Sequence, residues 1–175
     1  CGAKFVATMS GVGNIRWQIA PGQEHFKNEV LGLIASFSNT GTPIYQARNV
    51  LKRMVWQDQP VIVKSFAKPN AIRRLIYGRL RISKARKSFL HASKLRSLGI
   101  CTPEPIGFLE HHQGGGLRES FYICHEWRSG QTVREPLCDA DFADRTEILA
   151  SLGRFAWHLH QRGVYHRDFS PGNIL

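Results

Sequence analysis

The sequence predicts an α+β fold, in which a sheet-bearing first part is followed by a helical second part. Two observations lead to this class. Short apolar runs of strand type occur between residues 44 and 66 and again between 106 and 127. Apolar residues at helical spacing occupy the segment from 140 to 162, and the length of 175 residues suits one domain or two small lobes.

The first 66 residues contain a weakly patterned, glycine-rich start, one helix and three strands. We expect the helix over about 24 to 36, because apolar residues recur on one side of it, and a loop that ends at Pro43. Three strands should follow, from Ile44 onward, over Val50–Trp56 and over 60–66.

The third predicted strand is apolar on both faces, so we expect both faces to be covered by other parts of the protein. Lys64 should share one face with Ile62 and Phe66, because strand side chains alternate. A lysine in such apolar surroundings needs a charged partner or a ligand.

A long helix is predicted from 69 to 98, with an interruption at Gly78. It should end at Gly99, because the position after a helix favours glycine. The second half of this helix carries apolar residues at helical spacing, namely Ala85, Phe89, Ala92 and Leu95.

A β-hairpin and a further helix are predicted beyond residue 105. The hairpin turn is glycine-rich, and the helix has an apolar stripe and acidic residues at its start that are suited to capping. The predicted elements are arms over 106–110 and 120–127 with a turn at 113–116, a loop containing Pro136, and a helix over about 140 to 162 that is capped by Asp139 or Asp141 and closed by Gly163.

The chain is strongly basic, with 24 Lys and Arg against 13 Asp and Glu and a formal net charge of +11. Eleven of the basic residues lie between Lys64 and Arg96, a segment without any acidic residue. This segment predicts a negatively charged partner, either a nucleotide, a nucleic acid or a lipid headgroup. Sparse aromatic residues and the lack of a helix-turn-helix or zinc-finger signature disfavour nucleic acid. The simpler alternative is a solvated helix face.

Other classes are excluded by composition. No apolar run approaches the roughly 20 residues of a membrane span, and no signal-peptide pattern occurs. Four cysteines without a C-x-x-C pair fit a reducing compartment, so we expect a cytoplasmic protein that lies peripherally on the inner membrane if its basic segment meets anionic lipid. The chain starts at Cys1 and stops at Leu175 without punctuation, so we expect a fragment.

The most specific motif is H-R-D-F-S-P-G-N over residues 166–173, which fits the H-R-D-x-x-x-x-N catalytic loop of kinases. A carboxylate must accept a hydrogen bond from the attacking hydroxyl, and an amide oxygen five residues later can hold Mg²⁺ beside the phosphates. Asp168 is therefore the candidate base and Asn173 the candidate metal ligand, with His166 and Arg167 as their catalytic-loop neighbours. The alternative is a simple turn, because these residue types all favour turns.

The strand Val61-Ile62-Val63-Lys64 is similar to the V-A-I-K strand of kinases, whose lysine holds the α and β phosphates. Lys64 is thus the candidate ATP-binding lysine, and its alternative is a strand-end lysine that reaches solvent. Glu126 and Trp127 follow the hairpin where a kinase hinge binds adenine, mostly through backbone groups. The segment 41–48 has one glycine where kinases have three, so Arg48 or Lys52 is the candidate to assist the phosphates.

Together these motifs resemble the protein-kinase-like superfamily and, more narrowly, the bacterial lipopolysaccharide kinase family, which phosphorylates core sugars such as Kdo or heptose. The resemblance implies a kinase-like fold, ATP and Mg²⁺ as cofactors, and a lipopolysaccharide core sugar or another small hydroxyl compound as acceptor. It divides the chain into an extension over 1–40, an N-lobe with antiparallel sheet and long helix over 41–127, and the beginning of a helical C-lobe over 128–175. The resemblance rests on residues 44–49, 63–66, 68–70, 76–78, 83–85, 99–106 and 166–173.

Two departures from the kinase pattern concern the site. No carboxylate lies between Asp58 and Glu104, so the helix glutamate that kinases pair with the strand lysine is absent. Ser170 stands where protein kinases carry a lysine, which favours a sugar or other small acceptor over a protein. The alternatives are a kinase that acts on protein, a degenerate kinase that serves as a scaffold, and a non-enzymatic basic module for anionic lipid or nucleic acid.

The second metal-binding aspartate of kinases, in the D-F-G region, is not among these residues. We therefore expect the 175-residue chain by itself to show no meaningful phosphotransfer. Measurable turnover of ATP by the bare chain would contradict this expectation.

Overall fold

The protein is described by a computed structural model that covers residues 6–8, 14–67, 82–127, 132–166 and 168–174. The chain divides into two compact units, Cys1–Glu126 and Trp127–Leu175. The first contains an antiparallel sheet with helices and the second contains helices, which confirms the α+β class. Among the described residues, no helix is both long and apolar enough to cross a membrane.

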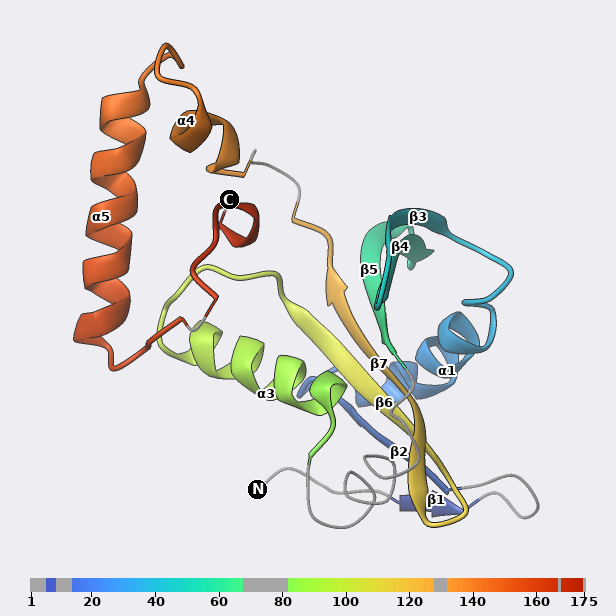
Figure 1. Ribbon diagram of the computed structural model, residues 1–175. Helices are drawn as coiled ribbons and strands as arrows, with labels where there is room; N and C mark the ends of the chain where they lie inside the picture. Colours follow the sequence, from blue (N-terminus) through green and yellow to red (C-terminus); the bar gives the residue numbers. More distant parts are fainter. Residues whose placement is uncertain (1–5, 9–13, 68–81, 128–131, 167, 175) are drawn as a thin grey trace. The chain divides into compact units, whose positions relative to one another are not determined.

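Seven strands form one sheet in the first unit, and every pairing is antiparallel (Figure 1). Their order across the sheet is β1-β2-β6-β7-β5-β4-β3, so that β1 and β3 are its edges. The strands are β1 (Val6–Thr8), β2 (Asn14–Ile19), β3 (Thr42–Gln46), β4 (Val50–Trp56), β5 (Gln59–Phe66), β6 (Pro105–Gln113) and β7 (Gly116–His125).

The predicted strands and hairpin are confirmed within a few residues, and the hairpin turns at Gly114 and Gly115, both with positive φ. Strands β1 and β2 lie in the glycine-rich start and are not predicted from the sequence. Yet β2 alternates apolar Ile15, Trp17 and Ile19 with polar residues, and this period of two was the available signal.

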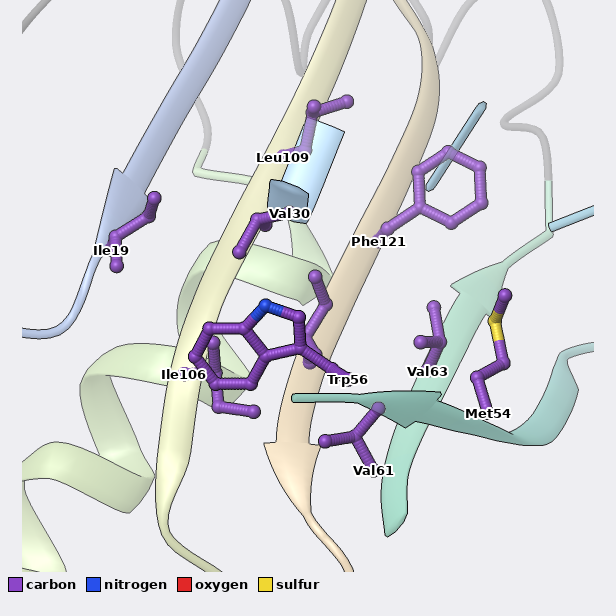
Figure 2. Close-up of a cluster of buried hydrophobic side chains, with 10 residues drawn as sticks. Ile19, Val30, Met54, Trp56, Val61, Val63, Ile106, Leu109 and Phe121 are labelled. Atoms are coloured by element: carbon purple, nitrogen blue, oxygen red, sulfur yellow. The ribbon is translucent and has the colours of Figure 1, made fainter. Parts of the chain in front are cut away.

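One face of the sheet carries the main core. Figure 2 shows its buried side chains, which converge from β2, β4, β5, β6 and β7, with Val30 added from α1 (Lys27–Ala35). Val61 and Val63 are fully buried here, as is Ile106. A short 3-10 turn, Glu24–Phe26, precedes α1, which confirms the predicted helix over 24–36.

The opposite face of the sheet is covered by α3 (Lys84–Ser97). Phe66 of β5 and Phe108 of β6 pack there against Ala85 and Phe89 of the helix. Because Phe66 is out of phase with Val63 along β5, the two clusters lie on different faces, and the prediction that β5 is covered on both sides is confirmed. Gly99, at φ 71°, ends α3 as predicted. The predicted helical segment 69–81 lies outside the described residues.

A buried polar cluster joins α3 to β6. Glu110 and His112 are 4% and 7% exposed, and Glu110 Oε2 lies 3.1 Å from His112 Nε2. Ser83 accepts the N–H of Arg86 at 3.0 Å, which caps α3, and also hydrogen-bonds the Glu110 carboxylate. Burial alone would raise the pKa of Glu110, but the hydrogen bonds of His112 and Ser83 and the charge of Arg86 outweigh it, so this pKa is lowered.

The second unit contains α4 (Arg134–Cys138), α5 (Arg145–Gln161) and a 3-10 turn, Pro171–Asn173. The prediction of a loop at Pro136 is wrong, because Pro136 lies in the first turn of α4, which begins at Arg134. Proline is tolerated in the first turn of a helix. The predicted helix start near 140 is also wrong, because α5 begins at Arg145.

The predicted caps of this last helix are wrong as well. The residue before α5 is Asp144, which has a left-handed backbone and makes no side-chain capping bond. Asp139 instead accepts the backbone N–H of Asp141 at 3.0 Å, so both residues belong to the turn that follows α4. Asp139, Asp141 and Asp144 lie close together in sequence, and only one residue can occupy the capping position of the helix.

Candidate active site

The second unit holds the loop that carries the predicted catalytic residues. Gly163, at φ 67°, turns the chain after α5, and its N–H donates to His160 O at 2.9 Å. Val164 N–H donates to Leu159 O at 2.9 Å, so the chain leaves the helix along a fixed path. The predicted glycine closure of this helix is thereby confirmed.

Asn173 closes the loop on itself. Its side-chain Nδ2 donates to the main-chain oxygen of Asp168 at 3.1 Å and to Ser170 Oγ at 2.9 Å. Its backbone N–H also donates to Ser170 O at 2.9 Å. The nitrogen end of the carboxamide is thus used inside the loop, which leaves the oxygen end as the one that can ligate a cation.

The Asp168 side chain is exposed, so that a substrate can reach its carboxylate. Aromatic contacts flank it: the His166 ring lies edge-on to Phe169 at 6.0 Å, and His160 stacks on Tyr165 at 5.0 Å. Val133 N–H donates to Ile174 O at 3.1 Å and fixes the end of the loop beside α4. Arg167 lies outside the described residues.

The donors in this loop fit Mg²⁺, because that ion prefers hard oxygen ligands and keeps several waters. The Asn173 carboxamide oxygen is a ligand of this kind, whereas the Asp168 carboxylate is the candidate base. They lie five residues apart on a loop whose shape is set by hydrogen bonds of the Asn173 amide nitrogen.

Lys64 lies in the first unit, on the face of β5 that α3 covers. Its Nζ is 5.3 Å from the centre of the Phe66 ring, which confirms the predicted shared face. It pairs in register with Tyr122 of β7 on one side and Leu51 of β4 on the other. Burial lowers the pKa of Lys64; Cys124 opposes this and Lys84, at the start of α3, reinforces it.

The surroundings of Lys64 are uncharged on the β7 side. Burial raises the pKa of Cys124 to about 11 and also raises the pKa of Tyr122, so both side chains are neutral at physiological pH. Within the described part of the chain, no carboxylate forms an ion pair with Lys64. The missing helix glutamate therefore has no substitute among these residues, and the helix charge that acts on Lys64 is the positive charge of Lys84.

The remaining predicted site residues have separate surroundings. Arg48 is exposed in the turn between β3 and β4. Glu126 uses its carboxylate for Arg53 of β4 and its N–H for Pro60 O, at 3.0 Å. Trp127 is 41% exposed.

Lys52 is not available for phosphates, which corrects its prediction. Its Nζ donates to Phe37 O at 2.6 Å and to Thr40 O at 3.0 Å, just beyond the C-terminus of α1. A cation is favourable at this end of a helix.

Gly41, the single glycine of the segment 41–48, has a packing role. A Cβ at this position would come within 2.7 Å of Met54 Cγ and 2.9 Å of Arg53 O. Glycine is therefore required for β3 to approach β4.

The comparison with protein families gives one match. The model of the family described as lipopolysaccharide kinase (Kdo/WaaP) matches residues 68–175, which include α3, the β6–β7 hairpin and the whole second unit. No curated protein and no solved structure matches the chain. Asp168 and Asn173 lie inside the matched segment, whereas Lys64 and Arg48 precede it.

Proposed function

The chain belongs to the lipopolysaccharide kinase (Kdo/WaaP) family, and from this membership we propose that it serves to transfer the γ-phosphoryl group of ATP to a sugar hydroxyl of the lipopolysaccharide core, on Kdo or heptose. The observation that carries this proposal is the closed loop from Asp168 to Asn173 inside the matched segment. In the same proposal, residues 41–127 form the nucleotide-binding lobe with residues 1–40 as its extension, and residues 128–175 belong to the helical lobe.

In the proposed reaction, the acceptor hydroxyl donates a hydrogen bond to the Asp168 carboxylate, which takes its proton as the oxygen attacks the γ-phosphorus and the bond to ADP breaks. Asn173, together with the second metal-binding aspartate that kinases carry in the D-F-G region, would hold Mg²⁺. The bound ion would neutralise part of the phosphate charge. Lys64 would bind the α and β phosphates. No carboxylate among the described residues pairs with Lys64, which fits this role, because the nucleotide itself then supplies the negative charge that a half-buried ammonium requires.

A sugar acceptor is favoured over a protein acceptor by the part that Ser170 plays in the loop. Its Oγ accepts a hydrogen bond from Asn173 at 2.9 Å, so this position contributes to loop shape. Protein kinases carry a lysine there, and such a side chain could not accept this bond. We also propose that the basic segment meets an anionic lipid or glycolipid surface. Its exposed described members are Lys84, Lys94 and Arg96 on α3, and residues 68–81 lie outside the described part.

The test uses the full-length gene product with γ-labelled ATP and Mg²⁺. Lipid A bearing Kdo, a heptose-bearing core oligosaccharide and a mixture of unphosphorylated proteins are offered as separate acceptors. We expect label on one of the two sugars. Label on protein alone would overturn the proposed acceptor class, and no transfer to any acceptor would overturn the proposed reaction.

Replacing Lys64 with alanine should lower kcat/KM for ATP by about 100-fold, the effect of removing one positioned group that stabilises transition-state charge. The matched control is Lys27→Ala, because Lys27 begins α1, which packs on the face of the sheet opposite to Lys64 and lies outside the basic segment. Steady-state kinetics with varied ATP measure both variants. Equal activity of Lys64→Ala and the control would remove Lys64 from the site.

A further inference from the structure

An ion pair links two strands that are not neighbours in the sheet. Arg53 on β4 donates from Nε to both carboxylate oxygens of Glu126, at 2.7 and 2.9 Å, and from Nη2 to Oε1 at 2.5 Å. Glu126 follows the end of β7, and β5 lies between β7 and β4 in the sheet (Figure 1). The pair therefore crosses over β5.

The register of the sheet places the Arg53 end of this ion pair two residues along β5 from Lys64, and the Glu126 end, which is opposite Pro60, four residues from it. Arg53 is opposite Ile62, and Lys64 comes two residues after Ile62 on the same face of β5. Two residues correspond to about 7 Å along a strand. Leu51, which is opposite Lys64, precedes Arg53 by two residues on β4, so one strand carries both the ion pair and the neighbour of Lys64.

Both ends of the ion pair are held in place by other contacts. His125 N–H donates to Glu104 O at 2.9 Å and Glu126 N–H donates to Pro60 O at 3.0 Å, which fixes the backbone at the end of β7. On β4, the residue before Arg53 is Lys52, which binds the carbonyls after α1 from the other face. Two consecutive residues of β4 thus make contacts on its two faces. Lys52 binds the carbonyls after α1 on one face, and Arg53 binds Glu126 on the other.

We propose that Arg53 and Glu126 are positioning residues for the nucleotide: their ion pair ties β4 to the end of β7 across β5, and so holds the β3–β4 hairpin in place before the triphosphate binds. This inference rests on the proposed function and names two residues that contact no reacting atom. The segment 41–48 lacks the three glycines of a kinase phosphate loop, and its one glycine, Gly41, is required for packing. In this proposal the β3–β4 hairpin is held instead by the side chains of Arg53 and Glu126.

Breaking the pair should weaken nucleotide binding and leave the chemistry intact. For Arg53→Ala or Glu126→Ala in the full-length gene product, we expect Kd and KM for ATP to rise about fivefold, which is the upper end for an exposed ion pair and suits its bidentate geometry. For Arg53→Ala, the kcat at saturating ATP and the KM for the sugar should not change. The charge-swapped double variant, Arg53→Glu with Glu126→Arg, should restore ATP affinity at least in part.

Direct titration of ATP, without acceptor, separates this inference from the proposed function. If the unaltered protein binds ATP and the single variants bind it equally well, the inference is overturned and the function stands. If both single variants bind ATP weakly and the double variant shows no recovery, the residues do not act as a pair and the inference is again overturned. If the unaltered protein does not bind ATP, both fail together.

Discussion

Replacing Asp168 with asparagine is expected to lower kcat for sugar phosphorylation by about 10²–10⁴-fold, because an amide cannot take the proton of the attacking hydroxyl. The loop geometry makes this a clean substitution. Asn173 binds the main-chain oxygen of Asp168, not its carboxylate, so the hydrogen bond that closes the loop should persist in the variant. The KM for ATP should therefore change little.

Steady-state kinetics of the full-length gene product measure this effect. The matched control is Asp141→Asn, an exposed aspartate in the turn that follows α4. Normal turnover by the Asp168→Asn protein would show that another group accepts the proton. A loss of folded structure in the variant, visible by circular dichroism, would contradict the expectation that the loop closes through the backbone.

The largest expected effect on stability comes from Glu110. Replacing it with alanine removes the carboxylate that joins His112 of β6 to Ser83 at the start of α3, and leaves buried polar groups without their partner. Loss of one member of a buried, hydrogen-bonded ionic cluster costs about 3 kcal/mol in the free energy of unfolding. Urea denaturation at pH 7 measures this difference.

The same residue predicts a dependence of stability on pH. The pKa of Glu110 in the folded protein is lowered, so its contribution is present above the unfolded-state value of about 4.3 and is lost as pH falls through the lower folded value. The difference in unfolding free energy between the unaltered protein and Glu110→Gln should therefore shrink below about pH 4.3.

The control for Glu110 is Glu104→Gln in the same unit. Glu104 is exposed and lies 3.7 Å from Arg96, so its loss should cost less than about 1 kcal/mol. Equal destabilisation by the two substitutions would show that burial of Glu110 does not matter. A difference that stays constant from pH 7 to pH 3 would show that its ionisation contributes nothing.

Local patterns allowed the prediction of local features. The strands around Lys64 and the loop from Asp168 to Asn173 are each contiguous in sequence, so composition and spacing were enough to predict β4, β5 and this loop. The helix α5 was misplaced at its start because Asp139, Asp141 and Asp144 are all suitable caps, and only the packed turn selects among them.

Features that depend on register could not be predicted. Arg53 and Glu126 are 73 residues apart, and their contact requires the order β4-β5-β7 and the alignment of Arg53 with Ile62. Lys52 was misassigned for the same reason, because the carbonyls that it binds come from a different element. Glu110 lies in a largely apolar stretch of β6, and its burial becomes evident only once α3 covers that face.

The edge strand β3 has a consequence for how the protein behaves among copies of itself. All five of its residues are exposed, it contains Pro43, and its pairing with β4 is interrupted by a register shift between Pro43 and Tyr45. Proline and irregular pairing at an edge both discourage a foreign strand from adding to the sheet. The edge strand β3 therefore resists aggregation by addition of a strand from another copy. A molecule that binds at this edge must be recognised through side chains and not through an added β-strand.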